Sequence, residues 1–131
     1  MNNLQIRKTR RKGRGVFALR VFKKGELIES CPIILFPTEL AWESDELETY
    51  VYGWCNGKDA LLLGYGSIYN HSYRPNARYD QNFKKKTVDF YAYKDIAKGQ
   101  EIVVSYNGYD DDGEPLKGRL WFKDGRWGGY E

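Results

Sequence analysis

The segment YNHSYRPNA, residues 69–77, contains His71, the only histidine of the chain. Flanked by Asn70 and Ser72, this histidine is compatible with three roles: a catalytic base, a metal ligand, or a buried residue that holds a crossing of the chain together. A catalytic base needs an orienting carboxylate and a nucleophile, and the sequence contains no G-x-S-x-G nucleophile elbow. The sequence therefore disfavours hydrolase chemistry, and the role of His71 depends on the motifs around it.

The composition predicts one domain with an interior rich in aromatic rings. A length of 131 residues is enough for one hydrophobic core but not for two. Aromatic residues make up 16% of the chain, and 11 residues are tyrosines. Each tyrosine offers an apolar face and a polar tip, so tyrosines suit pocket walls as well as a core. The formal net charge of +3 is only mildly basic.

The two cysteines, Cys31 and Cys55, are too few for a disulfide framework or a thiolate zinc cage. Together with His71 they match no zinc-ligand spacing, so we expect no metal site. The amino-terminal stretch MNNLQIRKTRRKGR lacks the apolar segment of a signal peptide. No apolar run approaches the roughly 20 residues that cross a membrane. These features predict a cytoplasmic protein without a membrane partner.

Short apolar–polar alternations separated by glycine turns predict a mostly β domain with one or two short helices. The clearest hairpin is expected over residues 78–95, around a turn of three lysines. One helix-like stretch covers residues 38–54, where apolar residues recur at roughly helical spacing and Gly57 follows as a stop.

The run RKTRRKGR, residues 7–14, is the strongest cluster of charge. Clustered Lys and Arg neutralise the phosphates of nucleic acids, but a strand with one solvated face gives the same pattern. Proteins that bind single strands also interleave aromatic rings with their cations, and this run contains none. We therefore do not expect direct nucleic-acid binding.

Three motifs follow one another along the chain. They are GRGVFA (residues 13–18), LGYGSIYNHSYRPNA (residues 63–77) and KGQEIVVSY (residues 98–106). This ordered set resembles the SET-domain family of protein-lysine methyltransferases, and the resemblance covers residues 4–109. The short length is similar to the minimal family members of bacteria and large viruses. The resemblance implies the β-clip fold of short β-sheets, one or two short helices, and a knot-like threading of the C-terminal part.

The resemblance also implies a site for S-adenosylmethionine, which leaves as S-adenosylhomocysteine, and a channel for the target lysine. Tyr106 matches the catalytic tyrosine and is also expected to contact the cofactor. The other implied cofactor-binding residues are Lys12, Gly13, Arg14, Gly15, Asn70 and His71. The residues expected to line the lysine channel are Tyr50, Tyr65, Tyr79, Val104 and Tyr109. In this interpretation His71 positions the cofactor and is not a base.

Many family members close the site with a cysteine-rich zinc segment after the catalytic tyrosine, and this chain has no cysteine beyond Cys55. We therefore expect residues 1–109 to form the SET domain and residues 110–131 to fold back over the cofactor and substrate site, within a single domain. Trp121 is expected to pack against the adenine side of the cofactor.

The resemblance implies transfer of methyl groups to the lysine ε-amine of a protein substrate, a histone or another basic protein. A viral or eukaryotic origin would imply action in the nucleus on chromatin. Minimal members of the family sometimes pair, so a homodimer is compatible with the sequence. Two alternatives stay open: a catalytically inactive SET-like protein-binding module, and a small basic nucleic-acid-binding β domain.

Overall fold

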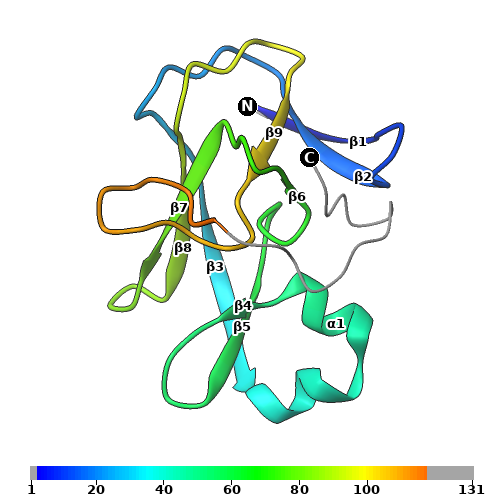
Figure 1. The fold of residues 1–131 in the computed structure, drawn as a ribbon, viewed down its shortest axis with the longest axis vertical. Coiled ribbons are helices and arrows are strands. Elements are labelled where there is room, and N and C mark those ends of the chain that lie inside the picture. Colours follow the sequence, from blue (N-terminus) through cyan, green and yellow to red (C-terminus); the bar gives the residue numbers. More distant parts are fainter. Residues whose placement is uncertain (1–2, 118–131) are drawn as a thin grey trace.

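The computed structural model describes residues 3–117, apart from the side chains of residues 46, 48 and 49. This part of the chain is mostly β, as the sequence predicts, and its strands form two sheets (Figure 1). The first sheet contains, in order, β1 (Leu4–Lys8), β2 (Arg14–Ala18), β9 (Glu101–Val104) and β6 (Asn70–His71). The second sheet contains, in order, β4 (Tyr52–Gly53), β5 (Lys58–Leu62), β3 (Leu27–Pro37), β8 (Thr87–Ala92) and β7 (Ala77–Asn82).

The hairpin of β1 and β2 begins the fold. Its antiparallel register pairs Leu4 with Ala18 and Lys8 with Arg14. Gly13 has a φ of 73°, in the left-handed region that favours glycine, and its carbonyl accepts a hydrogen bond from the Thr9 amide at 2.6 Å. The first glycine of the G-x-G motif therefore makes the turn from which β2 starts.

The hairpin predicted over residues 78–95 is confirmed as β7 and β8. These strands pair from Ala77–Ala92 to Asn82–Thr87. The Asn82 side chain accepts a hydrogen bond from the Lys85 amide at 2.9 Å and so stabilises the turn of three lysines.

The helix predicted over residues 38–54 is shorter and interrupted. The 3-10 helix η1 (Thr38–Glu43) stops before Ser44, whose hydroxyl accepts from the Leu47 amide and caps α1 (Asp45–Tyr50). Serine is a preferred residue at a helix start. Tyr52 then pairs with Ala60 in the second sheet, so strand pairing replaces the expected last helical turn.

The core lies between the two sheets and draws on most of the strands. The largest fully buried side chains are Tyr69, Phe22, Phe90, Ile96, Ile102 and His71. The rings of Tyr69 and Phe90 lie 4.6 Å apart between centroids. The YNHSYRPNA segment, residues 69–77, therefore contributes two of the most deeply buried rings, those of Tyr69 and His71.

The YNHSYRPNA segment, residues 69–77, crosses β9. β6 runs parallel to β9, and the Ser72 amide donates to the Val104 carbonyl. A few residues later, the Asn76 side chain donates to the Glu101 carbonyl and accepts from the Val103 amide. Successive residues of a strand direct their backbone groups to opposite edges. The segment therefore passes from one edge of β9 to the other, which is the knot-like arrangement that the sequence implied.

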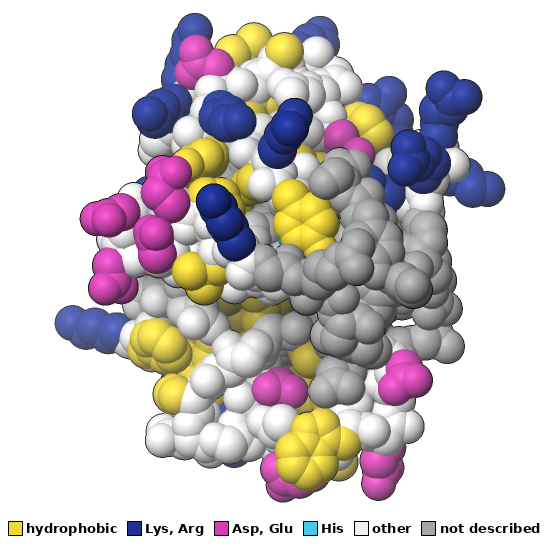
Figure 2. Space-filling view, in the orientation of Figure 1, with side chains coloured by type: hydrophobic (Ala, Val, Ile, Leu, Met, Phe, Trp, Pro, Cys, Tyr) yellow, Lys and Arg dark blue, Asp and Glu magenta, His cyan; other side chains and the backbone are white. Residues whose placement is uncertain are grey.

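One acidic cluster and one basic cluster lie at different sides of the molecule, and further charged side chains of both kinds are spread over the same face. Figure 2 shows acidic side chains at the left, over the segment after residue 109, and Lys and Arg side chains at the right, over the β1–β2 hairpin. Among residues 3–117, no helix is long and apolar enough to cross a membrane.

Candidate active site

Tyr106 is held at the point where the chain leaves β9. Its amide donates a hydrogen bond to His71 Nδ1 at 3.0 Å, and its hydroxyl donates to the Tyr69 carbonyl at 2.6 Å. The His71 ring is fully buried and packs edge-on against Tyr73 at 4.3 Å between centroids. His71 therefore acts in the fold as an anchor for the Tyr106 backbone. Within residues 3–117, no group of His, Cys, Asp and Glu side chains is arranged to hold a metal ion.

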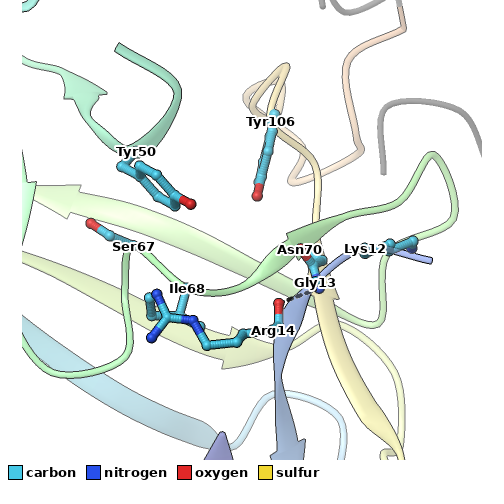
Figure 3. A pocket seen from close by; sticks show the side chains of 8 residues that line it. All are labelled: Lys12, Gly13, Arg14, Tyr50, Ser67, Ile68, Asn70 and Tyr106. Atoms are coloured by element: carbon cyan, nitrogen blue, oxygen red, sulfur yellow. Dashed lines mark hydrogen bonds between the residues drawn. The ribbon is translucent and has the colours of Figure 1, made fainter. Parts of the chain in front are cut away.

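A first pocket of about 220 Å³ opens beside Tyr106. Its lining residues come from the β1–β2 turn and the start of β2, the end of α1, the segment that leads into β6, β6 itself and the chain just after β9. They are Lys12, Gly13, Arg14, Tyr50, Ser67, Ile68, Asn70 and Tyr106. In Figure 3 the hydroxyl ends of Tyr50 and Tyr106 point into the same space. All three sequence motifs therefore contribute to one pocket, and Tyr106, the last residue of the third motif, is that motif's contribution.

Asn70 joins the three motifs by hydrogen bonds. Its side-chain amide donates to the Arg14 carbonyl at 2.9 Å, drawn in Figure 3, and to a Glu101 carboxylate oxygen at 2.8 Å. Asn70 is buried, with 5% of its surface exposed. The amide therefore fixes the G-x-G turn against both β6 and β9.

Gly15 is required by this network and not by a turn. A Cβ atom added at Gly15 would overlap the Glu101 carboxylate and come within 2.9 Å of Asn70 Nδ2. Any side chain there would displace the Asn70–Glu101 hydrogen bond. The second glycine of the motif is not among the residues that line the first pocket, whereas Gly13 is.

A second pocket of about 360 Å³ also includes Tyr106. It is lined by Tyr52, Gly53, Tyr79, Asp80, Gln81, Tyr106, Asn107, Gly108, Tyr109, Asp110 and Leu116. Tyr106 is the residue that the two pockets share. A group bound in one pocket and a group bound in the other would therefore meet at Tyr106.

The tyrosines of the second pocket are held by their own hydroxyls. Tyr52 donates to the Gly66 carbonyl, Tyr79 to the Ser105 carbonyl and Tyr109 to the Ala77 carbonyl. The Tyr79 ring packs edge-on against both Tyr52 and Tyr109, at 5.1 and 5.2 Å between centroids. Because the polar tips bond to backbone and the rings pack on one another, the wall of this pocket is rigid and aromatic.

These tyrosines stay neutral well above physiological pH. Burial raises the pKa of Tyr79 to about 12. Burial likewise raises the pKa values of Tyr52, Tyr106 and Tyr109 above the ordinary value near 10. The folded protein keeps these protons at pH values where an unfolded chain loses them. The resulting stability is present below about pH 10 and falls as the pH rises further.

The structure brings most of the predicted site residues together at two pockets. Lys12, Gly13, Arg14, Asn70 and Tyr106 line the first pocket, and Tyr79, Tyr106 and Tyr109 line the second.

Three residues that the resemblance places in the lysine channel do not line the second pocket. Tyr50 lines the first pocket, because α1 ends on that side. Val104 is fully buried in the core, since it alternates with Val103 along β9, and it lines neither pocket. Tyr65 packs against the core, and its amide donates to Glu29. Trp121 lies outside the described residues.

Several lining residues were not predicted. Ser67 and Ile68 lie inside the second motif, so their position in the sequence indicates that they are close to the site. Tyr52 was assigned to the helix and instead enters the second pocket from β4. Asp80, Asp110 and Leu116 carry no signal in the sequence, because they reach the pocket only through the packing of β7 and the segment after Tyr109.

Comparison with known proteins agrees with this fold. Residues 13–107 match the SET domain family, so the chain belongs to that family. It is a protein-lysine methyltransferase of a family whose members generally use S-adenosylmethionine.

The relatives are similar over most of the chain. The histone-lysine N-methyltransferase of Schizosaccharomyces pombe specific for H3 lysine-37 is 34% identical over 124 residues, which are 92% of this chain and 78% of that protein. A crystal structure of a proposed histone methyltransferase from Plasmodium falciparum is also 34% identical. It superimposes with a TM-score of 0.71 over 86% of this chain and 98% of its own.

Proposed function

We propose that this protein methylates a lysine of a histone or a similarly basic protein, with S-adenosylmethionine bound in the first pocket and the lysine entering through the second. The observation that carries the proposal is the position of Tyr106, which lines both pockets. The name of the Schizosaccharomyces pombe relative supports a histone as the substrate. Action on a histone would take place in the nucleus.

The first pocket offers groups that fit the cofactor. Lys12 and Arg14 supply positive charge for a carboxylate, and the backbone around Gly13 supplies hydrogen-bonding groups without a side chain in the way. Ile68 and the Tyr50 ring supply apolar surface for a nucleoside base. When bound, the cofactor supplies a methyl group on a positively charged sulfur.

The second pocket suits a lysine side chain. The rings of Tyr52, Tyr79 and Tyr109 attract a cationic ammonium and enclose an aliphatic stem. The same apolar surroundings disfavour the charged form of the amine, which must lose a proton before it attacks. The pocket therefore first holds the lysine and then favours its reactive neutral form.

Tyr106 aligns the reacting groups. In-line transfer to an amine depends mainly on the orientation of the two partners, and the Tyr106 hydroxyl is fixed by the Tyr69 carbonyl. Its oxygen still carries a lone pair that accepts weak C–H hydrogen bonds from a polarised methyl group. No side chain has to act as a general base in this mechanism.

Acidic residues beside the second pocket support a basic substrate. Asp80 and Asp110 line the pocket, and Asp111, Asp112 and Glu114 follow as exposed residues. Carboxylates at the mouth raise the local concentration of a cationic chain and slow its departure. We further propose that the segment from Asp110 onward borders the substrate path. Pairing with a second copy stays a prediction of the sequence.

Incubation with labelled S-adenosylmethionine tests the proposal. Histone H3 and an acidic protein of similar lysine content are offered separately, and the labelled residue is located by mass spectrometry. Label on a lysine of H3, with little on the acidic protein, is the expected result. Strong cofactor binding without label on any protein would contradict the proposal and favour an inactive binding module.

The pH dependence of the reaction is a second test. We expect kcat/KM to rise by about tenfold per pH unit between about pH 7 and 9.5, because free lysine has a pKa near 10.4. No decline is expected over this range, since the tyrosines stay protonated and the pKa of Tyr79 is raised to about 12. Initial rates with circular dichroism at each pH check this. A fall in kcat/KM near pH 9 with the fold intact would contradict it.

A further inference from the structure

The positive charge of this protein is concentrated at its amino-terminal end. Residues 1–25 contain nine Lys and Arg and no Asp or Glu, whereas residues 26–131 contain twelve Lys and Arg against eighteen Asp and Glu. The mild net charge of +3 therefore hides a strongly basic part and an acidic remainder.

Four of these cations lie on one β-hairpin. Arg7, Lys8, Arg10 and Arg11 belong to the β1–β2 hairpin and its turn, and all four are exposed; we call this set the basic hairpin. The Arg7 guanidinium lies 4.1 Å above the Phe17 ring, which fixes its direction.

The basic hairpin lacks neutralising partners among the described residues. Within residues 3–117, the ion pairs link Arg20 with Glu26 and Arg78 with Asp80, and none involves the basic hairpin. Charges on an edge strand such as β1 also prevent sheets from joining edge to edge. That role does not explain Arg10 and Arg11, which lie in the turn beyond the strand.

We propose that the basic hairpin binds the phosphate backbone of double-stranded DNA. This inference rests on the proposed function, because a histone substrate in chromatin is wrapped in DNA. The acidic residues after Tyr109 and the basic hairpin lie on opposite sides of the molecule in Figures 1 and 2. One side thus fits a basic protein, and the other fits the polyanion that accompanies it.

The missing aromatic rings do not count against this partner. Rings are needed to stack on the bases of single strands, whereas contacts to duplex phosphates need only placed cations. The expected binding is therefore independent of base sequence and weakens steeply with salt.

The test compares two triple variants by fluorescence anisotropy with a labelled 20-base-pair duplex. One variant carries Lys8→Gln, Arg10→Gln and Arg11→Gln, and the matched control carries Lys84→Gln, Lys85→Gln and Lys86→Gln. Both lose three exposed charges, but only the first loses them from the basic hairpin.

For four phosphate contacts, log Kd of the wild type should change with log salt with a slope of about 3 to 4. The hairpin variant should lose about 3 units of this slope and at least about tenfold in affinity at low salt. The control should resemble the wild type. Equal losses in both variants, or no binding by the wild type, would overturn the inference.

Methylation of free histone H3 separates this inference from the proposed function. The hairpin variant should methylate free H3 as the wild type does and should lose activity only on nucleosomes. If free H3 is methylated but DNA is not bound, the inference alone fails. If DNA is bound but no histone is methylated, the proposed function alone fails.

Discussion

Replacement of Tyr106 by phenylalanine is expected to lower methyl transfer by at least about 100-fold, because small misplacements at a reacting centre cost that much. The hydroxyl donates at 2.6 Å to the Tyr69 carbonyl, and this bond fixes the ring at the junction of the two pockets. Without the hydroxyl, the ring can move, and the oxygen that we propose as the acceptor for the methyl group is lost.

The fold should survive this change. The Tyr106 amide still donates to His71 Nδ1, so the backbone at the end of β9 keeps its anchor. Single-turnover rates and cofactor affinity should both be measured, since we expect the rate to fall far more than the affinity.

Tyr93→Phe is the matched control for Tyr106→Phe. The Tyr93→Phe substitution also removes a hydroxyl that donates a hydrogen bond, in this case to the Glu114 carboxylate. Tyr93 lines neither pocket. Near-normal rates for both variants would show that Tyr106 has no role in transfer.

Asn70→Ala is expected to weaken S-adenosylmethionine binding by at least about tenfold, equivalent to about 1.4 kcal/mol, and to destabilise the fold by about 2 kcal/mol. Both effects have one cause. The substitution removes the donor shared by the Arg14 carbonyl and the Glu101 carboxylate, and these two part-buried acceptors then lose this hydrogen bond. The G-x-G turn is then no longer fixed to the strand that carries Tyr106.

Calorimetric titration of the cofactor and thermal unfolding check these two effects. Asn82→Ala deletes the same atoms at an exposed turn, where the side chain accepts one bond from the Lys85 amide. Asn82→Ala should change neither cofactor affinity nor stability by a comparable amount. Unchanged cofactor affinity in Asn70→Ala would show that the network is structural only.

Local pattern was sufficient for much of the fold. Alternation of apolar residues and glycine turns predicted the β1–β2 and β7–β8 hairpins, because neighbouring strands in a hairpin need only a compatible turn. The helix ends earlier than predicted. Local periodicity does not show that Tyr52 pairs with Ala60 of another strand instead of continuing the helix.

The site was predicted unevenly for the same reason. Asn70 and Tyr106 lie inside the three motifs and were predicted from the order of the motifs along the chain, and the structure places both at the first pocket. Tyr52, Asp80 and Leu116 were missed, since no motif contains them and only packing brings them to the second pocket. Val104 lines neither pocket, because the face of β9 to which it points depends on what covers that strand.

The sequence by itself determined the family and the mostly β class, and it predicted Tyr106 as the catalytic residue. These follow from composition, glycine positions and motif order, which are properties of the chain before it folds. Only the tertiary structure decided what His71 does and which tyrosines surround Tyr106. A histidine becomes an anchor when the chain crosses β9 and brings Nδ1 to the Tyr106 amide, and a crossing depends on contacts between residues far apart in the sequence.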